Sequence, residues 1–348
     1  MPVTIKEIAE VTGLSVPTVG RILGNKGHLH RPEAREQVLE AARKMGYRAN
    51  SSARSMRTGR QGCFALLLST LGEASTLQSP LLQGLLDAMA IKDEHLIVFR
   101  APDHELTASD FIPKIIRELM ADGLLINYNA AIPSQMETLI EERHIPSVWI
   151  NSKHETDSVH PDDYAGAFDA TTYLLHLGHS RILYVSPIPT EASVPAPHYS
   201  VTDRRTGYVA AMRAEGLEPR FSPSTTYSAN DRQIATEFDA IMTAPDRPTA
   251  MLVNGANILN IALFNAIARG LRVPQDISLV LIDSEPPRHL GLPIPYPITT
   301  YEIPFAEMGR TAVDLLREKL RNCGAPVEPA RLPLTLREGA TCAPPASL

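Results

Sequence analysis

The spacing of apolar residues changes near residue 61 and divides the chain into a head and a body. In the head, apolar residues recur every three or four positions within short segments, which is typical of amphipathic helices. In the body, short apolar runs alternate with amphipathic segments, as strands alternate with helices. The helical stripes of the head are Ile5, Ile8 and Ala9, then Val19, Ile22 and Leu23, then Ala34, Val38, Ala41, Ala42 and Met45.

Capping and turn residues mark the ends of the first two helices of the head. Thr4 and Glu7 have the spacing of a capping box, and Gly13 supplies the positive φ of a tight turn. Ser15 is the expected N-cap of the second helix, whose first turn tolerates Pro17. Two helices joined by a short glycine turn predict a helix-turn-helix.

The pattern of the body predicts two α/β lobes. Strands separated by helices imply a parallel, doubly wound sheet in each lobe. Ligands of such sheets bind beyond the carboxyl ends of the strands, so a cleft between the lobes is the expected ligand site. The expected strands are Phe64–Leu68, Leu96–Phe99, Gly123–Ile126, Val148–Ile150, Ile182–Val185, Ala250–Val253 and Leu279–Ile282, and the expected helices lie near 80–91, 107–121, 133–143, 164–177, 204–215, 230–242 and 256–269.

Charge is distributed unevenly between the head and the body. Residues 1–60 carry a formal charge of +6 and the remaining residues carry −12, within a net charge of −6. A basic head on an acidic body indicates that a polyanion binds the head only. The alternative, a solvated charged tail, does not account for the apolar periodicity of the same residues.

Composition and motifs disfavour several other classes of protein. No apolar run has the length of a membrane span, and the first residues lack the apolar core of a signal peptide, so we expect a cytoplasmic protein. Three cysteines without CxxC spacing favour neither a disulfide framework nor a zinc site. Nucleophile-elbow, phosphate-loop and HExxH motifs are absent, and we predict no catalytic residue, no metal and no cofactor.

The outer face of the second helix carries the residues that we expect to contact DNA. A second helix with an exposed N-terminus fits the major groove. Arg21 can donate two hydrogen bonds to guanine, although an ordinary surface arginine is the alternative. Thr18 and the helix N-terminus suit phosphate groups. The expected contacts from the folded part of the head are Thr4, Ser15, Val16, Pro17, Thr18 and Arg21.

Residues 50–60 form a second basic element. The segment carries three arginines and one large apolar side chain, Met56. It is shorter than the roughly 12–15 residues that hold a helix alone, so we expect it to fold on a partner. Arginine next to an apolar wedge suits the minor groove, where the wedge can open a base step.

Two stretches of the head together carry a family signature. They are TIKEIAEVTGLSVPTVGRIL and REQVLEAARKMGYRANSSARSMRTGR, which join a helix-turn-helix to GYxxN and ARSxRTG. In this the head resembles the LacI/GalR family of bacterial transcription regulators. The resemblance implies that Val16, Pro17 and Arg21 read bases, and that a hinge helix after GYxxN intercalates at the centre of a palindromic site. The implied hinge residues are Asn50, Ala53, Arg54 and Met56.

The head departs from the family pattern at several positions. Met56 replaces the usual leucine and remains an apolar wedge, while Ala49 replaces the usual proline. Gly20 replaces a frequent serine, which weakens the helix by about 1 kcal/mol. The loop after the second helix is one residue longer than usual, so either His30 or Arg31 caps the third helix.

The body also resembles the family, over most of its length. The matching stretches include VHPDDYAGA, HLGHSRILYV, RRTGYVAAM and PITTYEIPFAEMGRTAVDLL. They imply a two-lobed, periplasmic-binding-protein-like core that the chain crosses three times, the last time near Arg331–Glu338. The implied divisions are a helix-turn-helix domain at 1–48, a hinge at 49–60, a core at 61–340 and a tail at 341–348, with the first lobe at about 61–160 and 295–325 and the second at about 163–290 and 328–340.

Polar residues near strand ends are the candidate effector ligands. By resemblance, Arg205 in R-x-G-Y matches the ligand-clamping arginine of the family, and Asp283 matches a carboxylate that accepts from the ligand. An arginine with carboxylate and amide acceptors suits a sugar or polyol. The alternatives are a structural Arg205–Asp283 ion pair and, for Trp149, burial in the core. The candidates are Trp149, Asn151, Arg205, Asn254 and Asp283.

We therefore expect a ligand-responsive repressor of carbohydrate genes that binds a near-palindromic DNA operator as a homodimer. A small-molecule effector between the lobes changes their closure and so the spacing of the hinge helices. The alternative is a sugar-binding or sugar-processing protein whose head is only an interaction module. A metal at His160, Asp162 and Asp163 is a weaker alternative to packing of the loop that crosses between the lobes.

Overall fold

The computed structural model consists of two compact units, Met1–Gln61 and Gly62–Leu348. We call them the head and the core and describe each by itself. The structure describes residues 3–24, 27–48, 59–70, 75–101, 120–128, 134–186, 198–222, 231–284 and 297–346.

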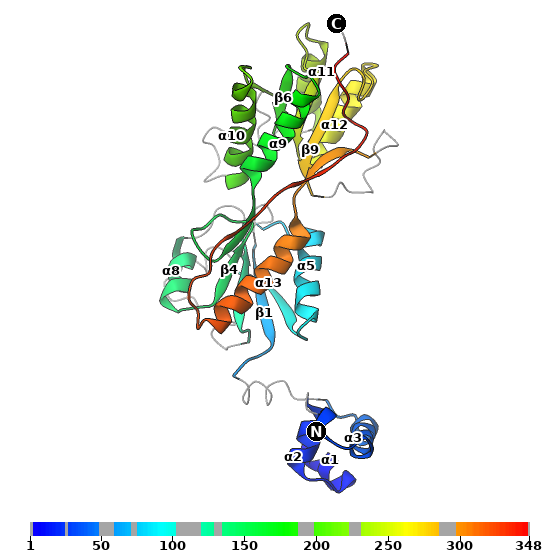
Figure 1. Cartoon of the computed structure of the whole chain (residues 1–348), viewed down its shortest axis with the longest axis vertical. Coiled ribbons are helices and arrows are strands. Elements are labelled where there is room, and N and C mark those ends of the chain that lie inside the picture. Colours follow the sequence, from blue (N-terminus) through cyan, green and yellow to red (C-terminus); the bar gives the residue numbers. More distant parts are fainter. Residues whose placement is uncertain are drawn as a thin grey trace. The chain divides into compact units, whose positions relative to one another are not determined.

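The head is a small helical bundle (Figure 1). Its elements are α1 (Ile5–Thr12), α2 (Val16–Leu23), the 3-10 turn η1 (Gly27–Leu29) and α3 (Pro32–Met45). Ile8, Val19 and Val38, one from each α-helix, are fully buried at its centre. These residues belong to the three predicted stripes, so the apolar spacing located the core of the head.

The ends of the head helices follow the predicted local chemistry. The Thr4 backbone N–H donates to Glu7 Oε2 at 2.7 Å, and this bond holds the pKa of Glu7 below its usual value. Gly13 ends α1 with a φ of 68°, which a side chain would strain. Arg31 precedes α3 without a side-chain capping bond, and Pro32 takes the first helical position, where no backbone N–H is required.

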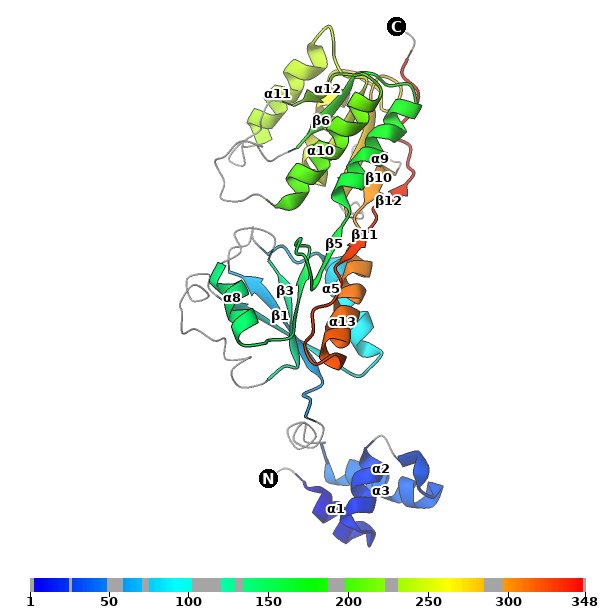
Figure 2. The same cartoon turned by 60° about the vertical axis from the view of Figure 1, so that its left-hand side comes forward.

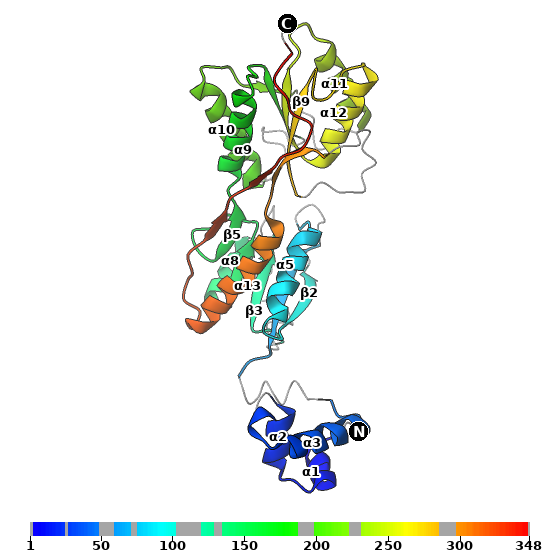
Figure 3. The ribbon, with the colours of Figure 1, turned by 45° about the vertical axis from the view of Figure 1, so that its right-hand side comes forward.

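The first lobe of the core is a six-stranded parallel sheet with helices on both faces. Across the sheet lie β11 (Ala330–Leu332), β5 (Ser158–Pro161), β4 (Ser147–Ile150), β3 (Gly123–Asn127), β1 (Cys63–Ser69) and β2 (His95–Ala101); the described helices are α5 (Ser79–Ala90), α8 (Ser134–Glu142) and α13 (Phe305–Arg321). Phe64 and Leu66 of β1 pack with α5 and α13, whereas Ala65 and Leu67 face α8. Figure 3 shows α5 and α13 side by side, and Gly84 lets them touch, because a Cβ there would lie 1.9 Å from the Ala306 carbonyl oxygen.

The second lobe repeats this architecture (Figure 2). Across its sheet lie β12 (Thr335–Arg337), β10 (Thr299–Glu302), β9 (Ser278–Asp283), β8 (Ala250–Asn254), β6 (Ile182–Val185) and β7 (Arg220–Phe221); the described helices are α9 (Asp163–His176), α10 (Tyr199–Ala214), α11 (Asp231–Thr243) and α12 (Ala256–Ala268). Only the β10–β12 pair of this sheet is antiparallel. All seven expected strands are present in the two lobes.

The expected lobe boundaries need two corrections. The expected first lobe includes residues 295–325, but β10 within them pairs with β9 of the second lobe. The expected second lobe includes residues 328–340, but β11 within them pairs with β5 of the first lobe. Such short strands, with few apolar residues, leave no pattern that places them in one sheet or the other. Most of the helix expected near 107–121 lies outside the described residues.

The expected tail begins as part of the second lobe. Thr341 is fully buried, and its hydroxyl accepts a hydrogen bond from the Thr299 backbone N–H at 2.9 Å. Its carbonyl accepts from the Leu279 backbone N–H at 2.8 Å. The chain is therefore fixed to the sheet at least as far as Ala343, whose backbone N–H donates to Ser278. Within the part of the chain that the structure describes, no helix has the length and apolarity to cross a membrane.

Candidate DNA-binding surface and effector site

The N-terminal half of α2 presents the residues predicted to contact DNA. Ser15, Val16 and Pro17 are exposed, and Val16 keeps 46% of its surface accessible although it is apolar. Ser15 Oγ accepts from the Thr18 backbone N–H at 3.3 Å, which caps the helix and orients its first turn. Arg21 is exposed one turn further along, while Val19 and Ile22 of the same helix face the core of the head. The arrangement suits insertion into a groove, and the individual DNA contacts remain predictions.

Two groups of predicted DNA contacts stand apart from α2. Thr4 is exposed, but its hydroxyl already donates to Glu7 Oε2 at 2.8 Å, so its first role is to begin α1. The hinge residues lie outside the described residues. They are Asn50, Ala53, Arg54 and Met56.

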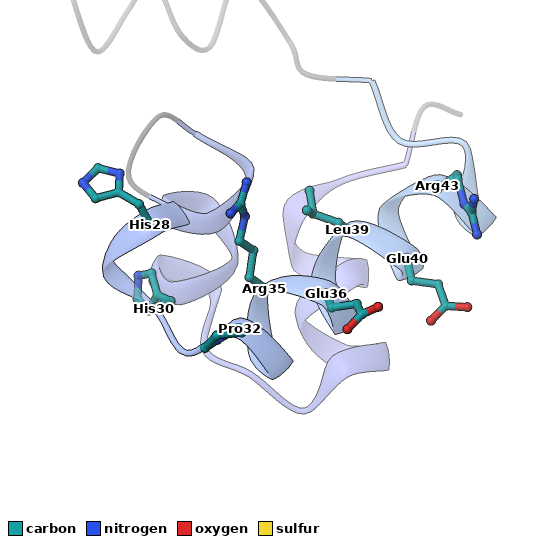
Figure 4. Close-up of a pocket in the computed structure, with 8 residues that line it drawn as sticks. All are labelled: His28, His30, Pro32, Arg35, Glu36, Leu39, Glu40 and Arg43. Carbon is teal, nitrogen blue, oxygen red and sulfur yellow. The ribbon is translucent and has the colours of Figure 1, made fainter.

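A concave surface of the head lies on the outer side of α3 and η1 (Figure 4). Its lining combines His28, His30, Arg35 and Arg43 with Glu36, Glu40 and Leu39. A phosphate-binding surface requires an excess of positive charge, and here two carboxylates lie among the cations. We therefore assign DNA binding to α2 and not to this concave surface.

Two of the predicted effector residues make stacking contacts within the protein, which differ from the ligand contacts expected of them. The Arg205 guanidinium stacks on the Phe221 ring, 4.5 Å from its centroid. The Trp149 ring is 6% exposed and stacks on His154 with 4.4 Å between ring centroids. Trp149 therefore has a structural role in the core, and the Arg205 guanidinium is occupied by the ring of Phe221, the last residue of β7.

Asp283, Asn151 and Asn254 are at strand ends, as predicted, but their contacts differ. Asp283 accepts from the backbone N–H groups of Ala256 at 2.8 Å and Ser284 at 2.7 Å, so it caps α12. Among the described residues, Asp283 forms no ion pair with Arg205, so the alternative of a structural Arg205–Asp283 pair is wrong. Asn254 is 5% exposed; its Nδ2 donates to the Val185 carbonyl, and its Oδ1 has no hydrogen-bond partner.

A buried ion pair that the sequence reading missed lies at the start of α9 and α10. Arg204 Nε donates to Asp163 Oδ1 at 2.6 Å, with 16% of the Arg204 side chain and 1% of the Asp163 side chain exposed. Burial alone would lower the pKa of Arg204, but the Asp163 carboxylate raises it, so the pair is charged. Asp163 Oδ2 is buried without a hydrogen-bond partner.

The choice of Arg204 over Arg205 follows from helix packing. A Cβ on Gly207 would lie 2.2 Å from the Tyr164 carbonyl oxygen, so this face of α10 touches α9 (Figure 2). Arg204 lies three residues before Gly207 and shares its face, whereas Arg205 is turned away by a further 100°. Gly207 was the signal in the sequence that identifies the inward arginine.

Two tyrosines complete what we call the buried polar cluster. Tyr199 OH is buried and makes no hydrogen bond of regular geometry, although the Asp163 carboxylate lies near enough to interact with it. Burial, followed by Asp163, raises the pKa of Tyr199. Burial raises the pKa of Tyr184 to about 12, while Arg204 and Asn254 act against that rise. The cluster comprises Asp163, Tyr184, Tyr199, Arg204 and Asn254.

Several contacts from the first lobe reach the helix that carries Arg204. His198 Nε2 lies 2.8 Å from the Asn151 carbonyl oxygen, and Lys153 Nζ lies 2.9 Å from Asp203 Oδ2. His160 of β5 packs edge-on against the Tyr199 ring. We call these contacts the lobe junction.

The residues of the metal alternative have other roles. Asp162 caps α9 by accepting from the Ala165 backbone N–H at 3.1 Å, and Asp163 pairs with Arg204. No group of three or more potential metal ligands occurs among the described residues. These contacts agree with packing of the crossover loop.

Two family models match separate parts of the chain. The bacterial regulatory protein lacI family matches residues 4–50, and a periplasmic binding protein-like domain matches residues 171–342. The first covers the helix-turn-helix, and the second covers most of the second lobe. The chain belongs to the LacI family of bacterial regulatory proteins. The alternative that the head is only an interaction module is thereby set aside.

Relatives of this LacI-family chain align over almost its whole length. The HTH-type transcriptional repressor PurR of Shigella dysenteriae serotype 1 is 28% identical over 331 residues, which cover 92% of this chain and 91% of the relative. PurR of Escherichia coli O139:H28 gives the same identity and coverage. This LacI-family chain is therefore a DNA-binding transcriptional repressor with a ligand-binding core, and it is not an enzyme.

Solved structures confirm the fold of the LacI-family chain. The lac repressor dimer bound to operator and the anti-inducer ONPF superposes with a TM-score of 0.74 at 21% identity, over 99% of this chain and all of the other. The transcriptional regulator CelR–cellobiose complex superposes with a TM-score of 0.62 at 21% identity, over 97% of this chain and 99% of the other. At these identities the likeness concerns the α/β architecture and not the ligand.

Proposed function

We propose that this chain represses its target genes from a near-palindromic operator, and that an uncharged effector with several hydrogen-bond donors binds at the buried polar cluster and changes operator affinity. The observation that carries the proposal is a set of buried polar atoms beside a charged pair that make no hydrogen bond of regular geometry: Asp163 Oδ2, Asn254 Oδ1 and Tyr199 OH. A buried polar atom without a partner costs about 1–3 kcal/mol, so a donor supplied by a ligand stabilises the liganded form.

The chemistry of the cluster narrows the effector class. A carboxylate oxygen and an amide oxygen only accept hydrogen bonds, so the effector has to donate. The cluster's one positive charge is already matched by Asp163, which disfavours an anionic ligand. Hydroxyl groups of a sugar or polyol satisfy these conditions, and the N–H groups of a nucleobase are the second candidate.

A homodimer is part of the proposal because two heads are needed for a near-palindromic site. The core exposes large apolar side chains on α12, where Phe264 is 55% and Ile267 41% exposed. It also exposes Leu86 on α5 by 43% and Val98 on β2 by 49%. Covering them with the same faces of a second copy is consistent with such a dimer. A DNA target places the protein in the cytoplasm.

Fluorescence anisotropy tests the DNA-binding half of the proposal. A duplex selected from a random pool by the wild-type chain is titrated at several salt concentrations, beside a scrambled duplex. We expect tight, salt-dependent binding of the selected duplex, with the logarithm of affinity falling linearly with the logarithm of salt concentration. Failure to select any duplex would overturn the proposal.

A thermal-shift screen tests the effector half. Sugars, polyols, sugar phosphates and nucleobases are each added to the wild-type chain, and a bound compound raises the melting temperature. For a compound that raises it, Tyr199→Phe should weaken binding, because only the hydroxyl is removed. Tyr164→Phe is the control, since Tyr164 is 44% exposed on α9. Equal affinity of both variants would place the effector elsewhere.

A further inference from the structure

His198 occupies an unusual position between the lobes, because its two ring nitrogens serve different partners. Nδ1 lies 2.7 Å from Ser200 Oγ and accepts from the Ser200 backbone N–H at 3.4 Å, which makes His198 the N-cap of α10. Nδ1 can accept from a backbone N–H only when it carries no proton. The proton of the neutral ring is therefore on Nε2, which donates to the Asn151 carbonyl oxygen at 2.8 Å.

The two partners of His198 belong to different lobes. Asn151 follows β4 in the first lobe and has a φ of 55°, a left-handed conformation that turns the chain sharply after the strand. Ser200 opens α10 of the second lobe, the helix that brings Arg204 to Asp163. The imidazole thus joins the backbone of one lobe to the helix N-terminus that positions the buried polar cluster.

We infer that His198 is a positioning residue that couples the buried polar cluster to the relative position of the two lobes, and that it does so only as the neutral ring with the proton on Nε2. This inference rests on the proposed function, because it gives the effector-binding helix a mechanical link to the first lobe. Protonation of Nδ1 would set an N–H against the Ser200 backbone N–H, and both the cap and the orientation of the ring would be lost.

The surroundings of His198 keep the ring neutral at pH 7. Burial lowers the pKa of His198, and Arg204 acts in the same direction. The Asn151 carbonyl, Asp163 and Asp203 oppose this shift. The centroids of the Tyr199 and His198 rings are 4.4 Å apart. Lys153 Nζ also contacts the Tyr199 ring, 5.9 Å from its centroid. His160 contacts the Tyr199 ring edge-on.

The sign of the pH effect follows from the lowered pKa. The junction in which His198 is buried favours the neutral ring, while a ring released to solvent titrates near its usual value. The junction is therefore fully stabilised above the usual histidine pKa, and acidification below that value weakens it. Because the link joins the lobes, acidification should alter operator affinity in the same direction as loss of the Nε2 donor.

Two substitutions distinguish the role of Nδ1 of His198 from that of Nε2. His198→Asn keeps an acceptor that can cap α10, since asparagine is a favoured N-cap, but it is too short to reach Asn151. His198→Gln keeps an amide N–H at the distance of Nε2 but lacks the geometry of the cap. Both are made in the full chain, and a two-state thermal melt confirms that each is folded.

The experiment measures affinity for a duplex selected by the wild-type chain, from pH 5.5 to 8. At pH 8, His198→Asn should shift affinity by roughly 3- to 10-fold, the effect of one lost hydrogen bond, and His198→Gln by less. Acidification of the wild type should move its affinity toward that of His198→Asn. The readout is the difference between wild type and variant at each pH.

Two outcomes would overturn the inference. One is a wild type and His198→Asn with parallel pH profiles and equal affinities while the selected duplex is still bound. The other is faster amide hydrogen exchange at Ser200 in His198→Asn, which would show that the substitution acts only by removing the cap. Failure to bind any selected duplex would instead refute the proposed function, so the two failures are distinguishable.

Discussion

Helices α2 and α10 each carry one glycine and one arginine that we assign to function, but they use them in opposite ways. On α2, Arg21 is exposed and a Cβ on Gly20 would have no neighbour within 4 Å. On α10, Arg204 is buried in an ion pair, and Gly207 touches the backbone of α9. The exposed arginine is free to read a partner, whereas the buried one is already committed to Asp163. Substitution on the exposed face of α2 should therefore cost the fold little, whereas substitution of Arg204 would leave the buried Asp163 carboxylate unpaired.

The largest effect is expected from Arg204→Met. The substitution keeps the volume but leaves the Asp163 carboxylate buried and unpaired, which should lower the free energy of unfolding of the core by about 3–5 kcal/mol. Urea denaturation followed by the fluorescence of Trp149 measures this directly, since it is the only tryptophan in the chain and belongs to the core.

Arg205→Ala is the matched control for that measurement. Arg205 stacks on a Phe221 ring that is 37% exposed, and such a contact contributes only about 0.5–1 kcal/mol. Equal losses for the two arginines would show that the Arg204–Asp163 pair has no special role and would remove the difference between the two helices.

Gly207→Ala is expected to destabilise the core by about 1–3 kcal/mol. The added methyl group would lie 2.2 Å from the Tyr164 carbonyl oxygen, and backbone cannot move aside as a flexible side chain can. Separation of α9 from α10 would also draw Arg204 away from Asp163. Differential scanning calorimetry of the full chain should show a lower core transition, and an unchanged transition would mean that the two helices are less closely packed than the structure shows.

Arg21→Ala tests the other side of the comparison. Loss of a two-pronged contact to guanine should lower affinity for the selected duplex by about 1–3 kcal/mol, or roughly 5- to 150-fold. Affinity for a scrambled duplex should change far less, and the unfolding of the core should not change. Equal loss on both duplexes would reduce Arg21 to a phosphate contact.

The sequence predicted the head more completely than the core, because the interactions that shape the head join residues close together in the sequence. Capping by Thr4 and Ser15 and the turn at Gly13 involve residues a few positions apart, so their spacing alone identifies them. The parallel strands were recognisable because they are buried on both faces, which leaves apolar runs such as that of β1.

The parts of the core that were missed depend on contacts between distant segments. The inward arginine was misassigned by one position because the motif contains two adjacent arginines, and only the approach of Gly207 to α9 decides between them. Nothing local shows that the His198 ring contacts a backbone carbonyl 47 positions away. The role of Asp283 depended on Gly255, which leaves α12 without a side-chain cap of its own.

The smallest expected effect, and one of opposite sign, is that of Gly20→Ala. The substitution is chemically the same as Gly207→Ala, but it lies in open space within α2, where alanine is favoured over glycine by about 0.5–1 kcal/mol. The head should therefore melt at a higher temperature, as measured by far-UV circular dichroism of the full chain at its head transition. Affinity for the selected duplex should not fall, because the hydrogen-bonding groups of Arg21 and Thr18 are unchanged. If the head is stabilised but affinity for the duplex is lost, the DNA backbone must approach α2 closely at Gly20. In the DNA-bound state, α2 would then be as closely packed at its glycine as α10 is at Gly207.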